Sequence, residues 1–174
     1  VLNFLNIYFL KSPVYQPESF AFSRRLASKY IALEETNNPN DIYFLTKEPE
    51  TMFRTYLFFN KHFIKENYTR IKHEYAINNE SFNFNKIHFI RDASQLPTSN
   101  DYALIADTDN YIFDKQTPSL FITQLSDAGK IYSIYNSSTC LDISSKIYTD
   151  NLNISDLAIE KLSQKDFCQK FITI

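Results

Sequence analysis

Glycine is nearly absent from this chain, and that scarcity limits the folds and sites it can build. Among 174 residues, Gly129 is the only glycine, where an average composition would supply about 12. Phosphate-binding loops of the Walker type, dinucleotide-binding fingerprints and kinase-type loops each need several glycines, because the backbone must approach the phosphate closely. The nucleophile elbow of serine hydrolases is excluded for the same reason. Any phosphate must therefore be held by side chains, by a metal ion or by helix N-termini.

The remaining composition predicts a single domain over residues 1–174. Hydrophobic residues make up 44% of the chain and aromatic residues 16%, enough for a dense core. The 18 basic and 20 acidic side chains nearly cancel, so no basic excess favours nucleic acid as a partner. No apolar run approaches the ~18 residues that a membrane span needs. The chain begins at Val1, which fits either a trimmed initiator Met or a fragment of a longer protein.

The cysteines and the glycosylation sequons bear on which cellular compartment the protein occupies. Cys140 and Cys168 have neither metal-ligand spacing nor a C-x-x-C arrangement. Two thiols in a domain of this size favour a reducing compartment, so we expect a cytoplasmic location. The chain also contains four Asn-x-Ser/Thr sequons, which matter only in a eukaryotic secretory setting. They begin at Asn67, Asn79, Asn136 and Asn153.

Short apolar runs alternate with segments of helical periodicity along the chain. This alternation predicts an α/β domain with a mainly parallel sheet, flanked by helices on both faces and Rossmann-like in arrangement. Two segments are less regular, namely a polar loop at 78–85 and a further strand at 141–147. The expected strands are 2–10, 42–46, 86–90, 102–106 and 131–135, and the expected helices are 17–35, 51–75 with a break near 67, 118–127 and 155–164.

The strand at 102–106 ends in two carboxylates one residue apart, Asp107 and Asp109. Open α/β sheets bind ligands at the carboxyl ends of their strands, and hard oxygen ligands of this kind hold Mn²⁺ or Mg²⁺ on a phosphate. The pair is therefore a candidate metal site, although it also fits a turn, where Asp and Asn are favoured. An EF-hand is excluded, because its sixth and twelfth positions would be Ile112 and Pro118 instead of Gly and Glu.

Two further residues near strand ends are candidates for nucleotide binding. Tyr15 follows the first expected strand, where an aromatic ring could stack on a base, and an ordinary loop aromatic is the alternative. Arg91 follows the strand at 86–90 and could reach a phosphate, with plain surface charge as the alternative. The three histidines of the chain lack zinc-protease spacing.

One segment and its context resemble a known family. The segment is Ala103-Leu-Ile-Ala-Asp107-Thr-Asp109-Asn-Tyr-Ile-Phe-Asp114, and it follows the order strand, helix, strand, long helix, strand. This pattern resembles the nucleotide-sugar half of the A-type glycosyltransferases, above all the retaining group that includes bacterial galactosyltransferases and glycogenin. In that group a hydrophobic strand ends in D-x-D and a leucine-aromatic step follows, matched here by Leu120-Phe121. The resemblance covers residues 3–135.

The resemblance implies a role for each candidate residue. Asp107 and Asp109 would hold Mn²⁺ or Mg²⁺ on the diphosphate of a nucleotide-sugar, and the ion would neutralise the leaving group while the sugar passes to an unknown acceptor. Tyr15 would stack on the base, and Arg91 would lie near the phosphates. The family's later metal motif, which contains His and Gly, is missing, because no His follows His88.

Two other hypotheses stay open. The same segment resembles the first motif of haloacid-dehalogenase-type phosphatases, which implies Asp107 as nucleophile, Asp109 as acid/base and Ser137 on the phosphate. Against this resemblance, the usual Gly-Thr after the second Asp is Asn110-Tyr111 here. The third hypothesis is a non-enzymatic α/β protein with an interaction, immunity or structural role, since aromatic side chains suit interaction surfaces and a fold alone implies no function.

Overall fold

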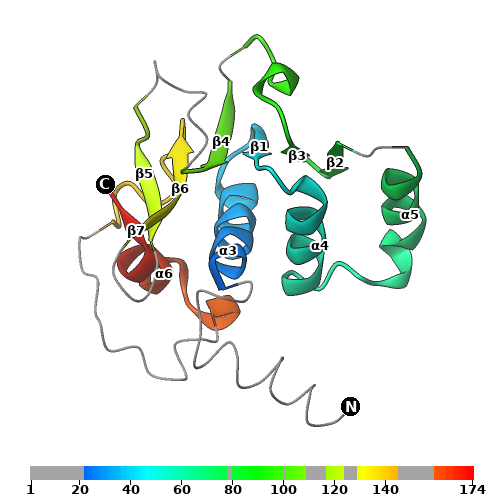
Figure 1. Cartoon of the computed structure of the whole chain (residues 1–174). Coiled ribbons are helices and arrows are strands. Elements are labelled where there is room, and N and C mark those ends of the chain that lie inside the picture. The colour runs from blue at the N-terminus through cyan, green and yellow to red at the C-terminus, as the bar shows by residue number, and fades with distance from the viewer. Residues whose placement is uncertain (1–21, 78–79, 100, 109–116, 124–128, 145–158) are drawn as a thin grey trace.

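A seven-stranded open sheet with the strand order β2-β3-β1-β4-β6-β5-β7 organises the molecule. The computed structural model describes residues 22–77, 80–99, 101–108, 117–123, 129–144 and 159–174 (Figure 1). The strands are β1 (Asp41–Leu45), β2 (Ser81–Phe84), β3 (Ile87–Ile90), β4 (Tyr102–Asp107), β5 (Leu120–Thr123), β6 (Lys130–Tyr135) and β7 (Ile172–Thr173). The helices are α3 (Phe22–Asn37), α4 (Pro49–Phe59), α5 (Tyr68–Ile77) and α6 (Gln164–Phe171), with single 3-10 turns η2 (Lys65–Asn67), η3 (Ala93–Gln95) and η6 (Ile159–Lys161).

The predicted mixture of helices and strands is confirmed, but the prediction of a mainly parallel sheet is wrong. Only the pairings of β1 with β3 and with β4 are parallel, and the other four pairings among the described strands are antiparallel. Short connections explain this result. Two residues, Asn85 and Lys86, join β2 to β3, and residues 124–129 join β5 to β6, whereas a parallel crossover needs about a dozen. A Rossmann-like arrangement is therefore not confirmed.

The described helices cover one face of the sheet, where both faces were expected to carry them. Alternate strand residues such as Phe44 and Ile105 lie in one large core cluster with Tyr30 of α3, Phe53 of α4 and Phe167 of α6 (Figure 1). Their neighbours along the strands face the other way and form a smaller cluster, completed by the segment around η3. The crossover from β3 to β4 contains this 3-10 turn instead of a helix, which leaves that face without one in the described residues.

Two segments differ in type from the sequence expectation. The expected polar loop contains β2, in which Phe82 and Phe84 are buried and alternate with half-buried polar residues. The expected helix at 118–127 contains β5, whose Leu120 and Ile122 are buried where it pairs with both β6 and β7. Both strands are four residues long, so the two-residue period spans too few positions to stand out from its polar surroundings.

Two helices have other boundaries than expected. The helical segment predicted at 51–75 is broken as expected, since α5 begins at Tyr68 just after the predicted break near 67. The first helix ends earlier than expected, because the chain leaves α4 at Phe59 and Lys61 adopts a positive φ of 58°. Of the helix predicted at 155–164, residues 155–158 lie outside the described residues, Ile159–Lys161 form the 3-10 turn η6, and the next α-helix, α6, begins at Gln164 with Ser163 as its N-cap. None of the described helices combines the length and the apolarity that crossing a bilayer requires.

Cys140 and Cys168 form a disulfide, which corrects the expectation of two thiols. Both residues are fully buried in the large core cluster. The bond joins the turn after β6 to α6 across 28 residues of sequence. Because β7 directly follows α6, the bond also fastens the strand at one edge of the sheet.

Candidate functional site

Asp107 is the last residue of β4, beside the point where β1 ends. Leu45 of β1 pairs with Ala106 in the parallel register, so Thr46 and Lys47 follow β1 next to Asp107. The Lys47 backbone N–H donates to Asp107 Oδ2 at 3.2 Å, and the Thr46 hydroxyl forms a second hydrogen bond to the carboxyl group. The half-buried carboxylate thus stands at the carboxyl ends of two parallel strands, where the sequence pattern predicted a ligand site.

Charged side chains of both signs surround this carboxylate. Burial raises the pKa of Asp107, while the two hydrogen bonds and the positive charges of Lys47 and Arg24 oppose that rise. Arg24 comes from the first described turn of α3 and also forms an ion pair with Glu48. Two cations and two carboxylates therefore meet at one edge of the sheet, and guanidinium and ammonium groups are the usual partners of phosphate oxygens.

Tyr132 completes this group from β6. It lies opposite Asp107 in the antiparallel register of β4 and β6, its side chain is buried, and its hydroxyl is hydrogen-bonded to Ser23. Burial, helped by the negative charge of Asp107, raises the pKa of Tyr132 to about 12. The phenol therefore stays protonated at neutral pH and can donate a hydrogen bond beside the carboxylate.

The other sequence-predicted site residues lie as follows. Asp109 and Tyr15 fall outside the described residues. Arg91 is exposed and follows β3, and its backbone N–H donates to Gln95 Oε1 at 3.0 Å. Because β1 lies between β3 and β4, Arg91 is at the same sheet edge as Asp107 but two strands away, a lateral separation of roughly 10 Å.

Ser137 lies far from Asp107. It follows β6, which runs antiparallel to β4, so the two residues are at opposite ends of the sheet. The Ser137 hydroxyl is buried and donates to Glu34 Oε2 at 2.6 Å. A phosphatase site in which Asp107 attacks a phosphate held by Ser137 is therefore not formed by these two residues.

Four residues of the site carry no recognisable sequence motif and were not predicted. Arg24, Thr46, Lys47 and Tyr132 come from three separate elements, and no motif joins them. The position of Thr46 and Lys47 directly after a predicted parallel strand is the one signal that could have identified them. Within the described residues, no group of three or more His, Cys, Asp or Glu side chains surrounds a common point.

No protein-family model, curated protein or solved structure matches this chain.

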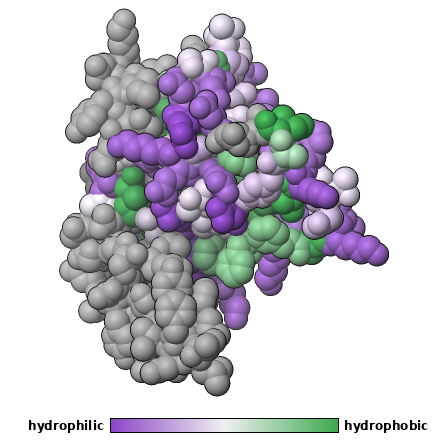
Figure 2. Space-filling view, turned by 45° about the vertical axis from the view of Figure 1, so that its right-hand side comes forward, coloured by the Kyte–Doolittle hydropathy of each residue, from purple (hydrophilic) through white to green (hydrophobic). Residues whose placement is uncertain are grey.

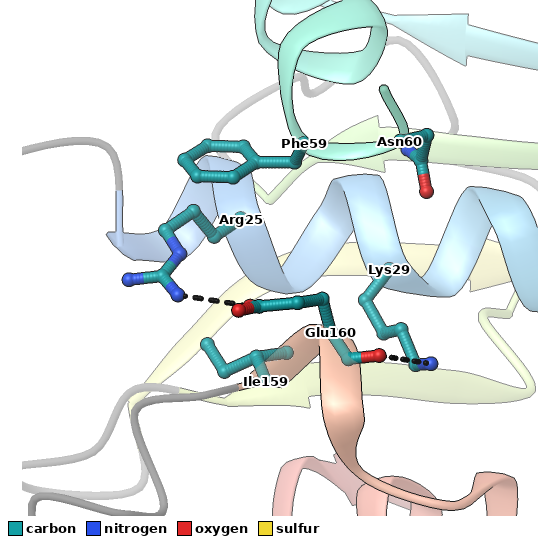
Figure 3. A pocket seen from close by; sticks show the side chains of 6 residues that line it. All are labelled: Arg25, Lys29, Phe59, Asn60, Ile159 and Glu160. Carbon is teal, nitrogen blue, oxygen red and sulfur yellow. Dashed lines mark hydrogen bonds and ion pairs between the residues drawn. The ribbon is translucent and has the colours of Figure 1, made fainter. Parts of the chain in front are cut away.

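A small recess elsewhere in the molecule is closed by its own contacts (Figure 3). It lies between α3, the end of α4 and η6, and its volume is about 10 Å³, room for about one water molecule. Arg25 Nη2 pairs with Glu160 Oε2 at 3.1 Å, and Lys29 Nζ donates to the Glu160 backbone oxygen at 3.4 Å. The Arg25 guanidinium also lies over the Phe59 ring at 5.0 Å. These contacts join α3 to η6 and leave no space for a larger ligand.

The segment from the end of α4 through α5 exposes many large apolar side chains. In the view of Figure 2, apolar and hydrophilic side chains lie next to one another on the surface that faces the reader. An open groove of about 760 Å³ follows η2 and α5, with Lys65 and Lys72 among its lining residues. Exposed apolar side chains gathered along one groove commonly mark an interaction site. The exposed apolar side chains are Phe58, Phe63, Ile64, Tyr68, Tyr75 and Ile77.

Asp107→Asn is expected to stabilise the folded chain at neutral pH. Because burial raises the pKa of the Asp107 carboxyl above its ordinary value of 3.8, the folded chain holds this proton more readily than the unfolded chain. The stability that this group contributes is complete below the ordinary value and is lost as the pH rises through the raised folded value. Asparagine does not titrate and can still accept from Lys47, so Tm at neutral pH should rise by roughly 1 to 3 °C.

Thermal melts over a pH series measure this effect. The gain should vanish below about pH 4, where the parent carboxyl is protonated in both states. The exposed Asp142 provides the control, and Asp142→Asn should change Tm little at any pH. A variant at position 107 that is less stable than the parent at neutral pH would show that the carboxylate stabilises the fold.

Proposed function

We propose that the chain is a metal-dependent glycosyltransferase domain, which binds a nucleotide-sugar through Asp107 and Asp109 and transfers the sugar to an acceptor. The observation that carries the proposal is the half-buried Asp107 at the carboxyl end of β4, with Arg24 and Lys47 close enough to act on its pKa. A chain with one glycine cannot bind a diphosphate through a glycine-rich loop, so side chains, a metal ion or helix N-termini must do so. The carboxylates and cations at the carboxyl ends of β1 and β4 include side chains suited to this role.

Asp107 keeps acceptor positions that would be open to a divalent cation. The described donors to Asp107 are the Lys47 N–H and the Thr46 hydroxyl, and a carboxylate offers about four acceptor positions, so lone pairs remain for an ion. Asp107 and Asp109 would hold Mn²⁺ or Mg²⁺, which supplies Lewis-acid stabilisation of the leaving diphosphate when bound.

The chain's own residues would position the substrate. Lys47 and Arg24 would contact phosphate oxygens through charge-assisted hydrogen bonds, and the protonated Tyr132 hydroxyl would donate nearby. Tyr15 remains the proposed stacking partner of the base, and Arg91 a proposed second phosphate contact.

Ligand-induced stabilisation tests the proposal. We expect Mn²⁺ or Mg²⁺ to raise Tm, and a nucleoside diphosphate to raise it further only when the metal is present. A ligand at one hundred times its Kd contributes about 2.7 kcal/mol, which corresponds to a Tm increase of roughly 5 to 10 °C for a chain of this size. Asp109→Asn should abolish the metal-dependent shift, while Asp142→Asn should preserve it.

The other outcomes contradict the proposal in different ways. A parent protein that responds to no metal or nucleotide favours an interaction role, for which the exposed apolar segment between Phe58 and Ile77 is the specific observation. Turnover of a generic aryl phosphate would favour a phosphatase. An Asp109→Asn variant that shifts as the parent does would remove the pair from the metal site.

A further inference from the structure

The buried disulfide changes the expected compartment of this chain. Cys140 and Cys168 are bonded to each other and have no solvent exposure. Structural disulfides form and persist in oxidising compartments, whereas cytosolic cysteines are kept reduced. The expectation of a cytoplasmic location was based on two thiols and loses that basis. In a eukaryotic secretory pathway, the Asn-x-Ser/Thr sequons of the chain become substrates for glycosylation.

The structure distinguishes the sequons from one another. Asn79 and Asn153 lie outside the described residues. Asn67 is half-buried in η2, and its side-chain Nδ2 donates to the His62 backbone oxygen at 3.0 Å. Asn136 is exposed in the turn that follows β6, and so is Ser138, the hydroxyl residue of its sequon. Of the two sequons whose asparagine is described, Asn136-Ser137-Ser138 is the one whose asparagine and hydroxyl residue are both exposed.

The surroundings of Asn136 can accommodate an attached sugar. Its φ of 54° lies in the left-handed region, which asparagine tolerates better than most residues other than glycine. A polar surface recess of about 310 Å³ borders Asn136 and Ser138, and its other lining residues include Asn38 and Gln164. A hydrophilic carbohydrate over this recess would cover polar groups and displace no core side chain.

We propose that Asn136 is an acceptor of N-linked glycosylation. In the modification, Asn136 Nδ2 forms a bond to C1 of the first sugar of an oligosaccharide carried on a polyprenyl diphosphate. The bond from C1 to the diphosphate oxygen breaks, Nδ2 loses one proton, and polyprenyl diphosphate is the leaving group. The transfer precedes folding, so the exposure of Asn136 matters afterwards, because it allows the modified chain to reach the native state.

The test is peptide mapping of the full chain, secreted by eukaryotic cells, before and after enzymatic removal of N-glycans. We expect the peptide that contains Asn136 to carry a glycan. We expect none at Asn67 in the folded, secreted chain, because a glycan on its half-buried Nδ2 would disturb the hydrogen bond to the His62 backbone oxygen and keep the chain from the native state. Ser138→Ala should abolish the Asn136 glycopeptide without altering the backbone at position 136. Ser138→Thr, which restores the sequon, should recover it. Thr69→Ala removes the Asn67 sequon and should leave the Asn136 glycopeptide unchanged.

Two results would overturn the inference. The first is an unmodified Asn136 peptide in the secreted parent, whatever the state of Asn67. The second is a secreted parent whose Cys140 and Cys168 react with a thiol reagent after denaturation without prior reduction, because the oxidised pair is the premise of the argument.

Discussion

Replacing Cys140 and Cys168 together by alanine is expected to lower the free energy of unfolding by roughly 3 to 4 kcal/mol. The bond closes a loop across 28 residues, and removing such a constraint increases the entropy of the unfolded chain by about this amount. Alanine is preferable to serine here, because both positions are fully buried and a serine hydroxyl would lack a partner. For a chain of this size the loss corresponds to a Tm decrease on the order of 10 °C.

Thermal melts with and without a reducing agent measure the effect. Reduction should lower Tm of the parent toward that of the double variant, and it should leave the double variant unchanged, which controls for other effects of the reductant. We expect the variant to lose α6 and β7 first, since the bond attaches them to the turn after β6. Equal midpoints for the parent and the variant would show that packing of α6 holds this region without the bond.

Glu34→Ala is expected to destabilise the chain by at least about 3 kcal/mol. The Glu34 side chain has no solvent exposure, and its carboxylate accepts hydrogen bonds from Asn38 Nδ2 at 2.8 Å, from Ser137 Oγ at 2.6 Å and from the Thr139 hydroxyl. Tyr30 extends the network through its hydroxyl, 2.7 Å from Ser137 Oγ. Removing the shared acceptor leaves the buried Ser137 donor and the half-buried Asn38 and Thr139 donors unsatisfied, at about 1 to 3 kcal/mol for a buried one and less for the others.

Urea denaturation of two variants separates the contributions at this position. Glu34→Gln keeps the shape of the side chain and one carbonyl acceptor, so it should lose less stability than Glu34→Ala. Glu66 is exposed, and Glu66→Ala should stay within about 0.5 kcal/mol of the parent. If the alanine and glutamine variants at position 34 were equally stable, the cost would come from charge alone and not from unsatisfied donors.

The sequence predicted the central strands well, because their residues carry a strong local signal. The apolar runs at 42–46, 86–90, 102–106 and 131–135 correspond to β1, β3, β4 and β6 within one residue at each end. Three of these strands form the parallel centre of the sheet, where both faces are buried and the run is nearly continuous. The shorter strands β2, β5 and β7, which lie toward the two sides of the sheet, were missed, since strand pairing and not local composition decides whether so short a segment extends.

Part of the candidate site was predictable for a similar reason. Asp107 follows a buried strand directly, so its position at the carboxyl end of β4 could be inferred from the pattern alone. The proximity of Arg24 and Tyr132 could not, because it depends on how α3 and β6 pack against β4. The disulfide could not be predicted either, because the spacing of Cys140 and Cys168 along the chain matches no cysteine motif.

The parallel centre of the sheet also has a kinetic consequence. β1 becomes a central strand only after β3 and β4, which lie far along the chain, have paired with it on both sides. Each pairing requires a long loop to close, and the entropy cost of this closure comes before any stabilising contact forms. The time needed to form these long-range pairings therefore sets the refolding time, on the order of milliseconds to seconds. A chain in which they have not yet formed exposes the unpaired edges of β1 to other chains.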